Sequence, residues 1–304
     1  MIDLSTDLCG VKLKNPTVLA SGFIGVTGAS LANAAKNGAG AVTSKSISLE
    51  PRKGHPTPVI AEFQGGFLNA VGLSNQGTVA SVEELHLAKK EGKVPVIASV
   101  FADSVENFAL TAEKLAAAKP DLIEVNISCP NVDDEFGTPF SADPSAAARV
   151  TKAVKQRVKM PVFVKLSPNV WSVKPIAKAV KAAGADGLTL INTVGGMLID
   201  PIARKPILTN KSGGVSGPAV KPVALKCVFD AYAETKLPII GMGGINNGID
   251  AAEMLMAGAS AVGIGTALYY RGADAFRLIA DELHDFMKEE GFSSVKEMVG
   301  LAHK

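Results

Sequence analysis

Eight short apolar segments alternate with Ala-rich helical patterns along this chain, and this alternation constrains the fold more than any other feature of the sequence. The segments lack the strict apolar–polar alternation of half-exposed strands, so we predict parallel strands that are buried on both faces. The predicted strands are Thr17–Ser21, Ala41–Ser44, Val94–Val100, Leu122–Ile127, Val162–Leu166, Gly187–Ile191, Pro238–Gly241 and Ala261–Ile264.

The predicted helices follow the strands in turn. They are Ala29–Asn37, Val82–Glu91, Val105–Ala118, Pro144–Val158, Val173–Ala183, Lys221–Thr235, Asp250–Ala257 and a last helix from about Ala273 to Glu289. Eight strands with helical crossovers predict an α/β fold, the (β/α)₈ TIM barrel. A doubly wound sheet is the alternative, but it usually has fewer strands and a glycine fingerprint after the first strand. Here that position reads Ala20-Ser21-Gly22-Phe23.

Four segments lie outside the repeating pattern. We expect Asp3–Lys14 to form an N-terminal β-hairpin that caps the bottom of the barrel. Three insertions, Glu50–Asn75, Pro130–Asp143 and Val194–Gly217, leave the C-terminal face, where barrel active sites are built. The sequence contains no linker or low-complexity tract, so we predict a single domain over residues 1–304.

Composition argues against several classes of protein. The 31 basic and 29 acidic residues give a net charge of +2, which offers no basis for binding nucleic acid or a membrane surface. The sequence has neither a signal-peptide pattern nor an apolar run of about 18 residues. Its three cysteines are scattered and its four histidines have no ligand spacing, which argues against disulfides and metal sites. We expect a cytoplasmic protein without a metal.

Polar residues and glycines collect where the predicted strands end. Because the carboxyl ends of all barrel strands meet at one face, these residues are expected to form one site there. The glycine pairs at the ends of the last two strands predict a phosphate site, although tight turns alone would also use glycine. The site residues are Lys45, Ser46, Asn126, Cys129, Lys165, Asn192, Thr193, Gly243, Gly244, Gly265 and Thr266.

Lys45 and Lys165 stand where apolar strands should point inward. A buried ammonium is costly unless an anionic group pairs with it. The partner could be a carboxylate of the protein, with Glu62 and Glu124 as candidates, or it could be a flavin ring or a carboxylate substrate. The residues alone leave these alternatives open.

Asparagines would border the same cavity, at positions Asn69, Asn126, Asn131 and Asn192. Several amides can together bind a planar ligand with alternating donors and acceptors, although any single one could be a turn residue. Cys129 opens the long insertion after the fourth strand, and this position favours a functional thiol. Cys9 and Cys227 are interpreted as inert and buried, since most unpaired cysteines behave as small buried hydrophobic residues.

Starting from the motif Asn126-Ile-Ser-Cys-Pro-Asn131, the chain resembles the class 1 dihydroorotate dehydrogenases, FMN enzymes of pyrimidine biosynthesis. The resemblance covers nearly the whole chain and is most like the 1B catalytic subunits. Further motifs in the same order are Ala20–Gly22, Lys45-Ser46, Gly54–Pro58, Leu68–Leu73, Lys165–Asn169, Ile191–Thr193, Gly213–Pro218, Gly241–Gly244 and Gly265-Thr266.

The resemblance implies a role for each matching position. Cys129 would be the catalytic base. The substrate would be held by Lys45, Asn69, Ala70, Val71, Gly72, Leu73, Asn126, Asn192 and Thr193. FMN would be bound by Ser21, Lys45, Ser46, Ser99, Asn126, Lys165, Ile191, Gly217, Gly243, Gly244, Gly265 and Thr266. Ser99 is a departure, because the family usually has the longer Asn there, and serine keeps a hydroxyl but reaches less far toward the flavin.

The implied reaction removes a proton from C5 of dihydroorotate and a hydride from C6, giving orotate. The hydride would go to FMN and the proton to Cys129, while Pro130–Asp143 would form a lid. The 1B resemblance also implies a homodimer and a partner subunit that carries FAD and a 2Fe–2S cluster and passes electrons to NAD.

Other readings compete with this one. The pyrimidine-reducing domain of dihydropyrimidine dehydrogenase shares the cysteine and the FMN barrel, but it is usually fused to modules that we do not expect in a chain of 304 residues. A non-redox barrel, such as an isomerase or aldolase acting on a phosphorylated substrate, belongs to a different class and would bind no flavin. A non-catalytic flavin-binding protein would not need Cys129.

Overall fold

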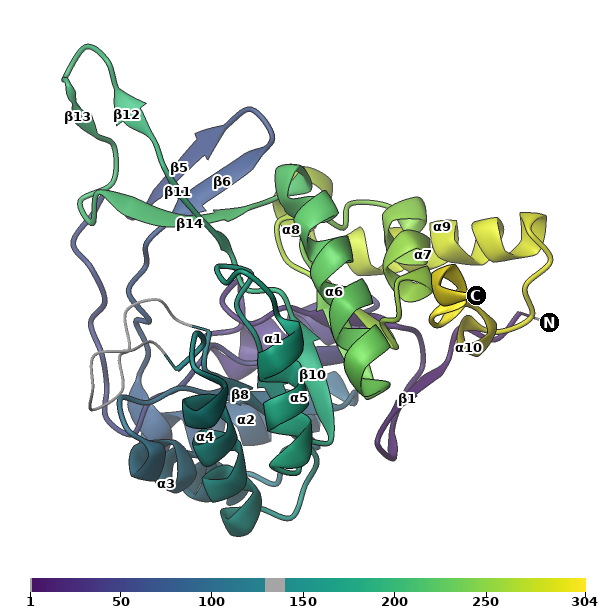
Figure 1. Cartoon of the computed structure of the whole chain (residues 1–304), viewed down its shortest axis with the longest axis horizontal. Coiled ribbons are helices and arrows are strands. Elements are labelled where there is room, and N and C mark those ends of the chain that lie inside the picture. Colours follow the sequence, from purple (N-terminus) through teal and green to yellow (C-terminus); the bar gives the residue numbers. More distant parts are fainter. Residues whose placement is uncertain (1, 129–139) are drawn as a thin grey trace.

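The computed structural model describes residues 2–128 and 140–304, and its centre is a closed barrel of eight parallel strands (Figure 1). Each barrel strand falls on one of the eight predicted segments, so the (β/α)₈ prediction is confirmed and the doubly wound sheet is excluded. In chain order the barrel strands are β3 (Thr17–Leu19), β4 (Ala41–Thr43), β7 (Val96–Val100), β8 (Leu122–Asn126), β9 (Val162–Lys165), β10 (Gly187–Leu190), β15 (Ile239–Met242) and β16 (Ala261–Ile264).

The helices cover the outside of the barrel. They are α1 (Gly28–Lys36), α2 (Gly77–Gly92), α3 (Val105–Ala116), α4 (Pro144–Arg157), α5 (Lys174–Ala182), η1 (Pro218–Val220), α6 (Lys221–Thr235), α7 (Gly248–Met256), α8 (Ala267–Arg271), α9 (Ala275–Glu289), α10 (Val295–Met298) and η2 (Leu301–His303). The prediction missed the first turn of α2, whose Thr78 hydroxyl bonds the Leu49 carbonyl, because that turn is fixed by tertiary contacts. It also missed α8, which Gly272 at φ +70° separates from α9.

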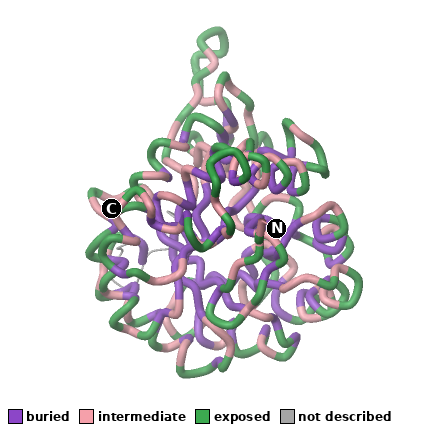
Figure 2. The backbone as a smooth tube through the Cα atoms, turned by 90° about the vertical axis from the view of Figure 1, so that its right-hand side faces the viewer, coloured by how far each residue is buried: buried purple, intermediate pink, exposed green. Residues whose placement is uncertain are grey.

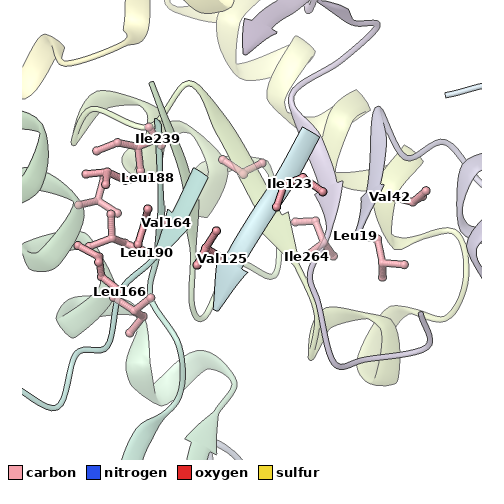
Figure 3. Close-up of a cluster of buried hydrophobic side chains, with 14 of the residues drawn as sticks. Leu19, Val42, Ile123, Val125, Val164, Leu166, Leu188, Leu190, Ile239 and Ile264 are labelled. Atoms are coloured by element: carbon pink, nitrogen blue, oxygen red, sulfur yellow. The ribbon is translucent and has the colours of Figure 1, made fainter. Parts of the chain in front are cut away.

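The barrel strands bury both faces. Residues such as Leu19, Ile123 and Leu188 point outward into the layer between the strands and the helices, and Figure 3 shows part of this apolar cluster. Residues such as Ile97, Phe163 and Ile240 point into the barrel. Both sets are apolar, which explains why the strands read as continuous runs rather than alternating ones.

The N-terminal hairpin closes the bottom of the barrel, as predicted. Its strands are β1 (Thr6–Leu8) and β2 (Val11–Leu13), paired antiparallel. Leu8 and Leu13 are buried in the same cluster as the inward side chains of the barrel. The Thr6 hydroxyl donates to the Ser260 carbonyl, just before β16.

Two of the insertions form a separate sheet that stands beside the barrel mouth (Figure 1). Its order is β11 (Val194–Met197), β14 (Ser212–Ser216), β6 (Gly66–Asn69) and β5 (Ile60–Phe63), and β12 (Ile199–Asp200) with β13 (Lys205–Pro206) extends it as an exposed hairpin (Figure 2). These strands were not predicted, because β6, β11 and β14 contain glycines that weaken the strand signal, while β5, β12 and β13 have only two to four residues. The glycines are required, since a Cβ on Gly214 would lie 1.9 Å from the Thr193 hydroxyl.

Candidate active site

Polar side chains form a layer inside the upper half of the barrel. Alternation along the strands turns Ser99, Glu124, Asn126, Lys165 and Thr189 inward, one step above the apolar residues that fill the lower half. All five are buried. They lie at or near the carboxyl ends of β7, β8, β9 and β10, the face at which the sequence places the candidate site.

One continuous chain of hydrogen bonds crosses this layer. The Asn192 amide donates to the Ser128 hydroxyl at 2.7 Å, and Ser128 donates to the Asn126 carbonyl oxygen at 2.7 Å. The Asn126 amide nitrogen then donates to the Ser46 hydroxyl at 2.9 Å. Ser21 adds a side branch, with its hydroxyl 3.3 Å from that of Ser46. The structure thus brings Ser21, Ser46, Asn126 and Asn192 together.

Ser99 lies at the other end of this chain. Its hydroxyl is 2.9 Å from the Ser46 hydroxyl and donates to the Glu124 carboxylate at 2.8 Å. The side chain is fully buried, with 0% exposure, and its backbone amide donates to the Ser44 hydroxyl. Ser99 therefore lies between two polar neighbours in the protein.

Lys165 faces Glu124, one of the two carboxylates that the sequence suggested. The Lys165 Nζ lies 3.8 Å from a Glu124 oxygen, and the two side chains are only 5% and 1% exposed. This separation is longer than a hydrogen bond. Among the described residues no acceptor lies within hydrogen-bonding distance of the Lys165 ammonium. The other candidate, Glu62, instead accepts from Tyr269.

Glycines make up the opposite side of the mouth, at the ends of β15 and β16. Gly243 has φ +125°, and a Cβ there would lie 2.8 Å from Ala224 and 3.2 Å from Ile191. Gly217, which follows β14, has φ +108°, and its Cβ would lie 2.7 Å from the Gly66 Cα. Gly244 has φ +77°, and its Cβ would lie 2.7 Å from that of Lys221. Turn geometry therefore requires Gly243 and Gly244, which is the plainer of the two interpretations that the sequence left open for this pair.

Gly265 is different, because the fold does not require it. Its φ is outside the left-handed range, and an added Cβ would meet only Ala20 at 3.6 Å, an ordinary contact. The neighbouring Thr266 hydroxyl donates to Ser216 at 3.2 Å. A glycine without a steric reason in the protein is typical of a position that a ligand approaches closely. A phosphate group would fit this side of the mouth.

The insertion sheet brings the remaining predicted substrate residues to the mouth. The Asn69 amide donates to the Gly214 carbonyl at 3.1 Å, and Gly214 abuts the Thr193 side chain. The following segment is held by backbone bonds, with the Ala70 amide donating to the Val59 carbonyl and Val71 accepting from His55. Gly72 and Leu73 both have positive φ, +76° and +57°.

Lys45 follows β4 and is half-buried. A Cβ on Gly22, just after β3, would lie 3.9 Å from the Lys45 ammonium, so this cation reaches across the end of β3. Its backbone amide donates to the Gly25 carbonyl at 2.7 Å. Lys45 and Lys165 thus bring two cations to one face of the barrel.

Cys129 and Asn131 lie outside the residues that the structure describes, as does most of the insertion predicted to form a lid. Burial raises the pKa of the Cys227 thiol to about 11. Burial, with the charge of Asp186, also raises the pKa of Cys9. Both shifts disfavour the reactive thiolate. Cys9 is exposed, however, so the prediction that it is buried is wrong, and Cys227 is only partly buried.

Three further residues belong to the site although the sequence assigned them no role in it. Ser128 bridges the two asparagines, and the Asn169 amide bonds the Thr193 carbonyl at 3.0 Å while its oxygen accepts from Gly195. Glu124 had been suggested only as a structural partner of a lysine. Ser128 and Asn169 stand in the motifs at the ends of the fourth and fifth predicted strands, but the sequence could not show their partners because Asn192 and Thr193 follow a different strand.

The fold and site define a class of protein: a (β/α)₈ barrel whose mouth combines cations and amides on one side with ligand-accessible glycine on the other. The family model for dihydroorotate dehydrogenase matches residues 3–287. The chain belongs to this family and is an oxidoreductase of the dihydroorotate dehydrogenase type.

Curated relatives narrow the family further. A Methanocaldococcus jannaschii protein named "Dihydroorotate dehydrogenase B (NAD(+)), catalytic subunit" is 49% identical over 304 residues, covering 99% of this chain and 98% of its own. Proteins with the same name from Methanothermobacter thermautotrophicus and Thermoplasma volcanium are each 48% identical, the latter over the full length of both chains. The resemblance to class 1B is therefore confirmed.

Among the described residues, no helix is long and apolar enough to cross a membrane. In the same ranges, no three His, Cys, Asp or Glu side chains are grouped so that they could hold a metal ion. The location in the cytoplasm and the single domain over residues 1–304 stay predictions.

Proposed function

We propose that this enzyme oxidises dihydroorotate to orotate with FMN as its cofactor and Cys129 as its base. The observation that carries the proposal is the Lys165 ammonium. It is buried at the barrel mouth, 3.8 Å from Glu124, with no hydrogen-bond acceptor among the described residues. Such a group calls for an electron-rich ligand, which a flavin ring would provide.

The proposed cofactor residues divide into two groups by chemistry. Lys165, Ser21, Ser46 and Asn126 would bind the ring, with Ile191 and Lys45 beside it. Gly217, Gly243, Gly244, Gly265 and Thr266 would take the phosphate, where backbone N–H groups can approach its oxygens closely. When bound, FMN supplies the acceptor for the hydride that leaves C6 of the substrate.

The substrate would lie above this layer, against the insertion sheet. Asn69, Asn126, Asn192 and Thr193 would hydrogen-bond its ring, and the Lys45 ammonium would neutralise its carboxylate. The backbone of Ala70, Val71, Gly72 and Leu73 would complete the binding site. The Cys129 thiolate would then take the proton from C5, as a general base must stand within hydrogen-bonding reach of the proton it removes.

Cys129→Ser tests the proposed base. The rate of flavin reduction by dihydroorotate, measured anaerobically by stopped-flow absorbance, should fall by a factor on the order of 10² or more. In the unchanged protein this rate should rise as the pH approaches about 8.5, the usual thiol pKa. Cys227→Ser is the matched control and should reduce its flavin normally. Wild-type-like reduction in the Cys129 variant at neutral pH would refute the role.

The cofactor is tested separately by heating the purified protein and analysing what it releases. Free FMN is the expected product. Release of FAD would contradict the assignment of FMN, and no bound flavin after reconstitution with FMN would contradict the proposed flavin chemistry.

We further propose that electrons leave through a partner subunit, with this chain forming a homodimer at the centre of the assembly. The relatives' name, which includes NAD(+) and a catalytic subunit, supports this route. The chain has three scattered cysteines, whereas a 2Fe–2S cluster needs four ligands in one place, and it lacks a dinucleotide fingerprint. The partner would therefore carry the FAD and the cluster.

Steady-state assays of the chain alone test this route. It should reduce a dye with dihydroorotate but transfer electrons poorly to NAD. Rapid NAD reduction by the lone chain would overturn the partner proposal, and efficient use of fumarate would indicate the 1A class instead.

A further inference from the structure

The hydrogen bonds in the upper barrel all point the same way, and the direction can be worked out from the donors. The Ser99 hydroxyl has one hydrogen, and Glu124 receives it at 2.8 Å. Ser99 can then only accept from Ser46, 2.9 Å away, so Ser46 donates to Ser99 and accepts from the Asn126 amide. The Ser46 hydrogen is thereby committed, and the Ser21 hydroxyl can only be its donor.

At the Asn192 end of this chain of hydrogen bonds, donation runs in the same direction. The Asn192 side-chain oxygen accepts from the Thr193 backbone amide at 2.8 Å, so its nitrogen is the end that donates to Ser128. Ser128 passes its own hydrogen to Asn126. Donation therefore runs in one direction from Asn192 to Glu124, across four strands of the barrel, and each bond polarises the next.

Glu124 is the only charged member of this chain of hydrogen bonds, and it also faces the Lys165 ammonium at 3.8 Å. It is 1% exposed, so water cannot replace either interaction. We propose that Glu124 is a positioning residue that serves both halves of the site. Its charge orients the amides of Asn126 and Asn192 toward the substrate through Ser99 and Ser46. The same charge offsets the Lys165 cation beside the cofactor.

This proposal rests on the proposed function, in which Lys165 faces FMN and the asparagines hold the substrate. It also gives Ser99 a role that does not require contact with the flavin. A serine hydroxyl, with one hydrogen to donate and the ability to accept at once, can link Ser46 to the carboxylate.

Two variants separate the two effects. Glu124→Gln keeps the shape of the side chain but removes its charge, leaving the Lys165 cation less compensated next to the flavin. Because reduction adds negative charge to the flavin, the midpoint potential should rise, equivalent to about tenfold or more in the redox equilibrium, which is about 30 mV for a two-electron couple. The dissociation constant for orotate, followed by the flavin absorbance, should also increase several-fold.

Ser99→Ala breaks the chain but leaves the charge in place. The orotate dissociation constant should again increase several-fold, while the midpoint potential should move much less than in Glu124→Gln. Asp121→Asn is the matched control, since Asp121 lies on the same segment at the bottom of the barrel and pairs with Lys89 at 3.1 Å. It should change neither quantity.

The outcomes distinguish this inference from the function on which it rests. A wild-type protein that binds no FMN, or that binds FMN but not orotate, would refute the proposed function. Normal binding in the wild type, with Glu124→Gln matching Asp121→Asn in both potential and orotate affinity, would overturn the role of Glu124. If Glu124→Gln does not fold, an unchanged orotate affinity in Ser99→Ala overturns the hydrogen-bond chain.

Discussion

The lower and upper halves of the barrel interior are built from the same strands but differ in chemistry. The lower half is filled by Val18, Ala41, Ile97, Leu122, Phe163, Ile240 and Ala261 and is closed by Leu8 and Leu13 of the hairpin. Two residues further along β7 and β9, Ile97 gives way to Ser99 and Phe163 to Lys165. Along each of these strands, two residues thus separate the apolar core from the polar site.

The difference shows how the fold divides its tasks. Apolar side chains in the lower half gain free energy by leaving water, and they hold the strands at fixed spacing. The upper half buries a cation, a carboxylate and several amides, a costly arrangement that only good hydrogen bonds offset. We therefore expect changes in the lower half to act on stability, and changes to the hydrogen-bonded or mouth-lining residues of the upper half to act mainly on ligand binding.

The largest effect on stability is expected from the lower half. Phe163→Ala removes a fully buried ring that lies over Gly187, where an added Cβ would come within 2.3 Å of it. The free energy of unfolding, measured by urea denaturation, should fall by about 3–5 kcal/mol. The FMN dissociation constant of the folded fraction should hardly change. A large loss of FMN affinity in a protein of normal stability would break the division between the halves.

A smaller effect, confined to binding, is expected from Gly265→Ala in the upper half. The fold has room for the methyl group, which would make an ordinary 3.6 Å contact with Ala20, so unfolding should change by less than about 1 kcal/mol. If the FMN phosphate approaches this backbone, the methyl group should raise the FMN dissociation constant by about tenfold or more. Fluorescence titration of the apoprotein measures the FMN dissociation constant. An unchanged constant would show that the phosphate does not bind beside β16.

Thr189→Val should change the free energy of unfolding by less than Phe163→Ala does, and it should raise this free energy rather than lower it. The Thr189 hydroxyl is buried inside the barrel with no hydrogen-bond partner among the described residues. Valine has nearly the same shape, so the apoprotein should become more stable by about 1 kcal/mol, as measured by thermal unfolding. Destabilisation by a similar amount would mean that the Thr189 hydroxyl has a hydrogen-bond partner. Thr189 would then belong to the hydrogen-bonded polar layer of the upper half.

The smallest effect concerns thiol reactivity outside the barrel. Because burial raises the pKa of Cys227 to about 11, only about one molecule in a thousand carries this thiolate at pH 8. Iodoacetamide at that pH should therefore leave Cys227 unmodified in the folded protein, and its labelling should rise as the pH is raised toward the folded pKa. Peptide mass spectrometry checks both points, with the urea-unfolded protein as the control.

The sequence by itself determined the barrel. Strands buried on both faces have a local signature, an apolar run such as Val162–Leu166 between helical patterns, and so do the glycines that end the strands. It also indicated which residues lie at the mouth, because every strand of a barrel ends at the same face. The family resemblance followed from motifs at those ends.

Only the tertiary structure decided which of these residues are partners. Of the two carboxylates suggested for Lys165, Glu124 rather than Glu62 faces it because β8 and β9 are neighbours and their side chains alternate in register, which no local pattern encodes. The insertion sheet was missed for a related reason. Its glycines read as loop, and their purpose is visible only where Gly214 abuts Thr193 and Gly66 abuts Ser216. Close approach between distant segments is a property of the folded chain, so it leaves only an ambiguous trace in sequence.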